Sequence, residues 1–150
     1  MYLLTDRLAG RINTNKGDTM KISVIGCGRW GSFLAWYSHR NGHTVTLYGR
    51  EGSAKLQELR ETHRNGLVTL DKGIRITSNL EEAVLPAEIL ILSVGAQGLR
   101  ALAQQLSVYP CAQKTVVLCM KGIEATTGKR LTQVVEEYLP DCLLYTSRCV

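Results

Sequence analysis

The chain has 150 residues, of which 45% are hydrophobic, and a formal net charge of +5. This length can bury one substantial core but is short for two domains. The basic residues are spread along the chain, which argues against a nucleic-acid-binding surface and favours attraction of small anionic ligands such as a phosphorylated substrate.

Cysteine spacing bears on the redox compartment, and hydropathy bears on whether the chain crosses a membrane. The five cysteines lack the paired spacing of metal or redox motifs, and no apolar run reaches the ~20 residues that cross a bilayer. The N-terminus lacks the apolar centre of a signal peptide. We therefore expect a cytoplasmic protein with no integral membrane segment. His39, His43 and His63 show no ligand spacing, so we expect no metal.

The two ends differ from the middle of the chain. Residues 1–19 show no helical or strand periodicity, and a clean strand pattern begins at Met20, which indicates a non-native or disordered leader. Residues 141–150 lack cap, turn and amphipathic patterns and resemble translated adapter sequence. We expect an artefactual or disordered tail there, and a natural protein that continues beyond Pro140 with other residues. Residues 20–140 then form one domain.

Within that domain, short apolar runs alternate with helical patterns, which is typical of β-α-β units and a mostly parallel sheet. Strands are expected at 22–25, 44–48, 89–92 and 115–119, and a weaker one at 74–77. Helices are expected at 29–41, 56–64, after Asn79, at 99–106 and at 131–138. The first helix is apolar nearly all round, so we expect it to pack on the sheet and on a second partner.

A glycine-rich segment, Gly26-Cys27-Gly28-Arg29-Trp30-Gly31, joins the first strand to the first helix. In this context Gly26 permits a tight turn, Gly28 lets the backbone approach a pyrophosphate, and Gly31 allows close contact between helix and strand. The weaker alternative is a glycine turn that serves packing alone and binds no ligand. The pattern predicts a Rossmann-type, doubly wound α/β domain that binds a dinucleotide at a helix N-terminus.

The end of the second strand bears on the choice of cofactor. NAD-specific folds usually place an acidic residue there to hold the ribose, but this chain offers Arg50, whose guanidinium fits a 2′-phosphate. We therefore expect a preference for NADP(H), with NAD(H) as the alternative. Glu51 could still accept from the ribose, and Arg50 could be a solvated surface charge.

Polar residues also follow the later strands, at the sheet edge where open α/β folds bind ligands. Ser93 and Gln97 are candidates to line the cofactor, although a plain strand-to-helix turn would use similar residues. Lys121 is a candidate to hold a substrate phosphate or polarise a carbonyl, with Gly122 allowing a sharp turn. A lysine in a loop is more often solvated.

Together these segments resemble the N-terminal domain of the NAD(P)-dependent glycerol-3-phosphate dehydrogenases. The resemblance is carried by residues 22–31, 42–50, 121–124 and 127–129. It implies interconversion of dihydroxyacetone phosphate and glycerol 3-phosphate for phospholipid synthesis. It also implies that Arg29 and Trp30 flank the cofactor, that Arg50 meets the adenosine ribose or its phosphate, and that Lys121 touches the nicotinamide side and the substrate.

The chain departs from the family pattern in several respects, and other functions remain as alternatives. The family often has a small residue where Arg29 stands and a proline where Gly95 stands. Its acid/base lysine belongs to a C-terminal helical domain that this chain lacks, so we assign no catalytic residue here and expect the fragment to be inactive. The full-length protein is expected to form a homodimer. The alternatives are a stand-alone nucleotide-sensing module and, more weakly, another dehydrogenase such as a ketopantoate reductase.

Overall fold

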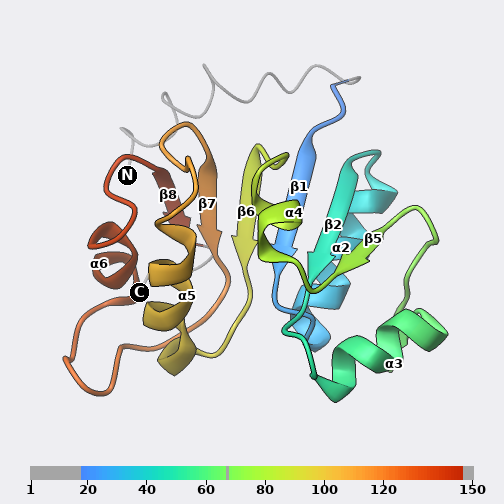
Figure 1. Cartoon of the computed structure of the whole chain (residues 1–150), viewed down its shortest axis with the longest axis horizontal. Coiled ribbons are helices and arrows are strands. Elements are labelled where there is room, and N and C mark those ends of the chain that lie inside the picture. The colour runs from blue at the N-terminus through green and yellow to red at the C-terminus, as the bar shows by residue number, and fades with distance from the viewer. Residues whose placement is uncertain (1–17, 67, 147–150) are drawn as a thin grey trace.

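The computed structural model describes residues 18–66 and 68–146 and contains a sheet of six parallel strands (Figure 1). The strands are β1 (Lys21–Ile25), β2 (Thr44–Tyr48), β5 (Arg75–Thr77), β6 (Ile89–Leu92), β7 (Thr115–Leu118) and β8 (Leu143–Thr146). The helices are α2 (Arg29–Arg40), α3 (Ala54–Thr62), α4 (Leu80–Val84), the 3-10 turn η1 (Ala96–Gly98), α5 (Leu99–Leu106) and α6 (Leu131–Glu136). A short antiparallel hairpin, β3 (Arg64–Asn65) and β4 (Val68–Thr69), follows α3.

The strand order is β5-β2-β1-β6-β7-β8, so successive strands are added on one side of β1 up to β5 and on its other side from β6 onward. The chain winds outward from β1 to β2 and β5, then crosses back to β6 and winds outward on the other side. This is the doubly wound Rossmann order, and it confirms the expected fold class. Such a reversal opens a crevice where the carboxyl ends of the two central strands diverge, which is where these folds bind ligands.

Helices cover both faces of the sheet, as the apolar strands require. Val24 and Ile25 are neighbours in β1 and are both fully buried, but they point to opposite faces. Val24 belongs to a core cluster that includes residues of α2 and α3, whereas Ile25 packs with residues of α4, α5 and α6. Figure 1 shows α4 and α5 in front of the sheet and α2 behind it.

The second partner expected for α2 is the β3–β4 hairpin. Asn65 donates from Nδ2 to the hydroxyl of Ser32 at 2.7 Å, and Val68 packs against the core cluster that contains Ala35 of α2. Trp30 and Tyr37 nevertheless remain 54% and 56% exposed. Sequence patterns missed the hairpin because its strands have two residues each and cannot show an alternation.

The expectation of a structureless tail from residue 141 is wrong for Leu143–Thr146. These residues form β8, which pairs in parallel with β7 in the register Val116↔Leu144. A strand at the edge of a parallel sheet needs no clean alternation, so its pattern is weak. Residues 147–150 and 1–17 of the expected tail and leader lie outside the described residues, and whether either end is native stays untested.

We expect Leu144→Asp to lower the stability of the chain by about 2 kcal/mol, because Leu144 packs against the core cluster of α4, α5 and α6. The matched control is Thr146→Asp, at an exposed position of the same strand. Thermal unfolding followed by circular dichroism measures both. Equal midpoints for the two variants would show that β8 contributes nothing to the folded state.

Across the described ranges, no helix is both long enough and apolar enough to cross a membrane.

Candidate functional site

The glycine loop between β1 and α2 is fixed by backbone contacts that exclude side chains. Gly26 has φ +120°, and a Cβ there would lie 2.2 Å from the carbonyl oxygen of Ser93 at the end of β6. Gly31 is buried in the first turn of α2, where a Cβ would lie 1.9 Å from the carbonyl oxygen of Gly26. The start of α2 therefore lies close to the end of β1 and to the segment that follows β6, an approach that Gly31 allows as predicted.

Gly28 has a different environment. It is the N-cap of α2 with an ordinary φ of −68°, and a Cβ added there would meet no atom within 4 Å. The first turn of α2 contains no acidic side chain. Its amide groups and the helix dipole therefore favour an anion beside Gly28, and the open space lets a pyrophosphate reach the backbone.

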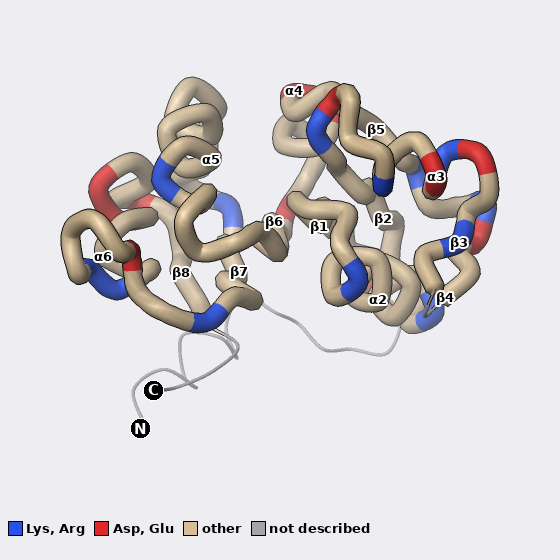
Figure 2. Tube along the Cα trace, turned by 90° about the horizontal axis from the view of Figure 1, so that it is seen from below, with Lys and Arg blue, Asp and Glu red and all other residues tan. Residues whose placement is uncertain are grey.

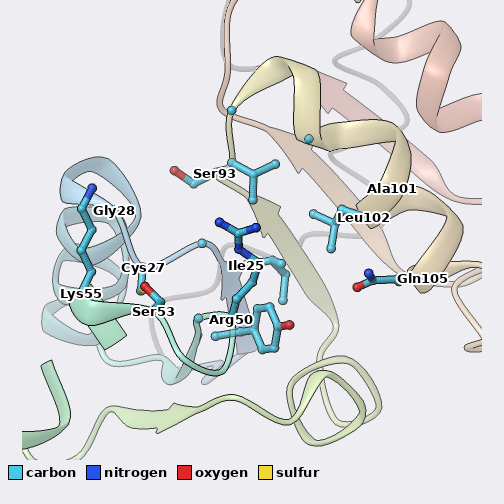
Figure 3. A pocket seen from close by; sticks show the side chains of 16 residues that line it. Ile25, Cys27, Gly28, Arg50, Ser53, Lys55, Ser93, Ala101, Leu102 and Gln105 are labelled. Carbon is cyan, nitrogen blue, oxygen red and sulfur yellow. The ribbon is translucent and has the colours of Figure 1, made fainter. Parts of the chain in front are cut away.

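A pocket of about 540 Å³ opens beside this loop at the carboxyl edge of the sheet. Its walls come from the glycine loop, the end of β2, the start of α3, the segment after β6, and α5 (Figure 3). Figure 2 views the molecule from this edge and shows Lys and Arg positions spread around it rather than gathered in one patch. The volume is within the range of small-molecule sites.

The end of β2 places basic groups in this pocket. Arg50 reaches into the middle of it, and Lys55 and Ser53 lie on the side of the glycine loop (Figure 3). Glu51 is turned away toward α3, with its carboxylate 3.6 Å from Nη1 of Arg60. A hydrogen bond with Ser78, aided by Arg60, lowers the pKa of Glu51. The acid that could have bound a ribose is therefore engaged elsewhere.

The structure brings together some of the predicted cofactor residues and separates others. Gly26, Gly28, Arg50 and Ser93 all line the pocket, and Gly31 is buried beneath the loop. Four others lie outside the pocket lining and are exposed: Arg29 and Trp30 on the first turn of α2, Gln97 on η1, and Lys121 after β7.

Sequence analysis missed Lys55 and Ser53. The available signal was a serine at the start of a helix that follows the second strand, with a lysine two residues later. Lysine in the first turn of a surface helix is usually solvated, so the pattern alone carries little weight.

Gln97 has a structural contact that the sequence did not predict. Its Nε2 donates to the carbonyl oxygen of Ile123 at 3.0 Å, and its Oε1 accepts from the amide of Ala125 at 2.9 Å. Both ends of the side-chain amide therefore hold the loop after β7. The predicted cofactor contact of Gln97 would require it to release these partners.

Lys121 begins that loop at the carboxyl edge of β7. Gly122 adopts φ +108°, which confirms the predicted sharp turn beside the lysine. The loop then closes on itself, because the amide of Glu124 donates to the carbonyl oxygen of Lys129 at 2.9 Å. Lys121 itself is exposed, so its ammonium can reach a ligand at this edge.

Glu124 is a buried carboxylate with a strong partner. Arg100 of α5 donates from Nε and Nη2 to its two oxygens at 2.7 and 2.8 Å, and Thr127 donates to it as well. These hydrogen bonds, with Arg100 the largest cause, lower the pKa of Glu124 to about 2. The residue is only 5% exposed.

The low pKa makes part of the stability dependent on pH. An unfolded glutamate binds its proton near pH 4.5, whereas Glu124 in the folded chain does so near pH 2, so its contribution is complete above about pH 5 and is lost as the pH falls toward 2. We expect the unfolding midpoints of the unaltered chain and Glu124→Gln to differ most near neutral pH and to converge in acid. Thermal scans across this range measure it, with the exposed Glu81→Gln as control. A constant difference would contradict the assignment.

Comparison with known proteins agrees with this geometry. The family model described as NAD-dependent glycerol-3-phosphate dehydrogenase N-terminus matches residues 21–146. The chain is 35% identical over 131 residues to the glycerol-3-phosphate dehydrogenase (NAD(P)+) of Thermoanaerobacter sp. (strain X514), covering 85% of this chain and 39% of that protein. It is 34% identical over 128 residues to that of Bacillus thuringiensis (strain Al Hakam), covering 83% and 37%.

A solved glycerol-3-phosphate dehydrogenase from Coxiella burnetii superposes with a TM-score of 0.73 at 19% identity, covering 81% of this chain and 38% of that one. This likeness supports the fold. The chain thus spans about two fifths of the length of the curated relatives it matches. The family match and the residues that it covers show that the chain belongs to the NAD-dependent glycerol-3-phosphate dehydrogenase family, as its N-terminal, nucleotide-binding part.

Proposed function

We propose that this chain supplies the cofactor-binding domain of an oxidoreductase that interconverts dihydroxyacetone phosphate and sn-glycerol 3-phosphate, a reaction that feeds phospholipid synthesis. The main support is the glycine loop, which lies where the strand order changes side between β1 and β6 and lines a pocket of about 540 Å³. The open face of Gly28 fits a pyrophosphate, because backbone amides can approach it without steric conflict. The bound nicotinamide would supply the hydride.

The other residues of the chain would bind and orient. Ser93 lies beside the glycine loop and would contact the middle of the dinucleotide. Lys121 would attract the phosphate or carbonyl oxygen of the substrate from the same sheet edge, since an ammonium stabilises developing negative charge. Arg29 and Trp30 would flank the cofactor from the first turn of α2. The resemblance to the family assigns the acid/base lysine to another domain, and this chain alone is not expected to turn over substrate.

Three observations support a preference for NADP(H) over NAD(H). Arg50 reaches into the pocket at the end of β2, Lys55 lies nearby, and Glu51 is paired with Arg60 instead of facing the pocket. Two cations suit a 2′-phosphate, whereas a ribose diol needs an acceptor such as a carboxylate.

We expect Arg50→Gln to weaken NADPH binding about 30-fold, which is about 2 kcal/mol, and Lys55→Gln to weaken it about fivefold. NADH binding should change less than twofold in both variants, because NADH lacks the 2′-phosphate. Calorimetric titration of the chain with each cofactor measures these constants. Arg64→Gln is the matched control, since Arg64 is exposed and lies outside the pocket. Tighter binding of NADH than of NADPH by the unaltered chain would overturn the preference.

The cytoplasmic location and the homodimer stay predictions. Fractionation of cells that express the protein tests the first, and light scattering of the protein in solution tests the second.

A further inference from the structure

We propose that Arg100 is a positioning residue, which acts through Glu124 to hold the loop that carries Lys121 at the ligand edge of the sheet. This loop, residues 120–130, connects β7 to α6 and is called here the Lys121 loop. The inference rests on the proposed function, because it assumes that Lys121 contacts the nicotinamide side of the cofactor or the substrate.

The ion pair between Arg100 and Glu124, called here the clamp, has the bidentate geometry of a strong ion pair. The guanidinium donates two parallel hydrogen bonds, at 2.7 and 2.8 Å, to the two oxygens of one carboxylate. The Glu124 side chain is 7% exposed, so water competes little with these bonds. Removing Arg100 leaves the carboxylate of Glu124 buried without its partner, which favours displacement of the loop.

The clamp extends from the Lys121 loop to α6. Nη1 of Arg100 donates to Oε2 of Glu137 at 2.5 Å and to the hydroxyl of Tyr138 at 3.3 Å. The guanidinium carbon also lies 5.7 Å from the centre of the Tyr138 ring. Arg100 therefore ties α5, the Lys121 loop and the segment at the end of α6 to one side chain.

Gln97 provides a second attachment one turn before Arg100. Its side-chain amide pairs with the backbone of Ile123 and Ala125, the two neighbours of Glu124. The Lys121 loop is thus held to one short stretch of chain by the ion pair and by two hydrogen bonds between the Gln97 side chain and the loop backbone. Lys121 lies three residues before Glu124, with only Gly122 and Ile123 between them.

The same stretch of chain also forms a wall of the dinucleotide pocket. Gly98, Ala101, Leu102 and Gln105 line the pocket, while Arg100 of the same helix holds the Lys121 loop. Figure 3 shows Leu102 and Gln105 across the pocket from Arg50. Helix α5 therefore sets the position of Lys121 relative to the pocket. Arg100 is the side chain of α5 that holds the Lys121 loop in that position.

The test compares two ligands of the 150-residue chain. NADPH carries the nicotinamide, whereas 2′,5′-ADP carries only the adenosine half that Arg50 and Lys55 would hold. If Arg100→Gln leaves the loop in place in about one tenth of the molecules, NADPH binding weakens about tenfold. Binding of 2′,5′-ADP should stay within about twofold, because its site does not involve the loop. Lys121→Met should show the same pattern.

Hydrogen exchange gives a readout that does not depend on a ligand. In Arg100→Gln the amides of Glu124, Ala125 and Gly128 should exchange faster, while that of Val24 in β1 should not change. Arg75→Gln is the matched control, since it breaks the exposed 2.8 Å pair with Glu82 on another part of the chain. Glu124→Gln keeps the size of the side chain and decides the question if Arg100→Gln does not fold.

The possible results separate this inference from the proposed function. If Lys121→Met weakens NADPH binding but Arg100→Gln and Glu124→Gln do not, the positioning role is overturned and the proposed function stands. Equal loss of both ligands in the clamp variants would show a general structural role and would also overturn it. If the unaltered chain does not bind NADPH, or if Lys121→Met has no effect, the proposed role of Lys121 fails and this inference fails with it.

Discussion

Replacing Gly31 by alanine is expected to destabilise the chain by at least about 3 kcal/mol and to lower its unfolding midpoint by about 10 °C. The added Cβ would lie 1.9 Å from the carbonyl oxygen of Gly26 and 3.5 Å from the Cβ of Ser93. Because backbone crowds this position on one side and the Ser93 side chain on the other, α2 cannot move to relieve the clash without opening the core. The loss is a large fraction of the stability of a typical domain.

Thermal and urea unfolding followed by circular dichroism measure this change. A titration with NADPH should show that the variant has also lost dinucleotide binding, because displacement of α2 moves the amides that would hold the pyrophosphate. An unfolding midpoint within 2 or 3 °C of the unaltered chain, equivalent to about 1 kcal/mol, would contradict the packing role of Gly31.

Gly28→Ala is expected to differ from Gly31→Ala in stability: the fold is kept and only binding is lost. A Cβ at Gly28 meets no atom within 4 Å and its φ of −68° suits any residue, so the stability cost is less than about 1 kcal/mol. The methyl group would occupy space that the pyrophosphate needs, however. We expect NADPH binding to weaken about 100-fold, or about 2.8 kcal/mol.

The two alanine variants control for each other, because each adds one methyl group to the same loop. Calorimetric titration and thermal unfolding of both give four values: Gly31→Ala should lose stability and binding, whereas Gly28→Ala should lose binding alone. Unchanged NADPH affinity in a folded Gly28→Ala variant would show that the dinucleotide does not cross this part of the loop.

Sequence patterns were most informative where a rule depends on the backbone. The strands β1, β2, β6 and β7 appear as short, mostly apolar runs because they are covered on both faces. The glycine loop was recognised because a tight turn and a close approach each exclude a Cβ. The edge strand β8 was missed because it packs on the core through few side chains, and its sequence alone does not distinguish it from a tail.

The candidate site was less predictable where contacts join distant segments. The pairing of Gln97 with the backbone of Ile123 and Ala125 spans 26 and 28 residues, and the ion pair of Arg100 with Glu124 spans 24. Local periodicity carries no information on such contacts. Arg50 was identified because the Rossmann fold fixes its place at the end of the second strand, whereas Lys55 follows no comparable rule.

The contrast between a crowded glycine loop and exposed basic residues has a consequence for engineering cofactor use. Gly26 and Gly31 leave no room for a methyl group, so the backbone of the glycine loop, beside which the pyrophosphate would lie, has little freedom to vary. Arg50 and Lys55 are exposed, and substitutions at such positions usually change stability by less than about 0.5 kcal/mol. A library restricted to residues 50 to 55 could therefore redirect the domain between the two nicotinamide cofactors while the scaffold remains intact.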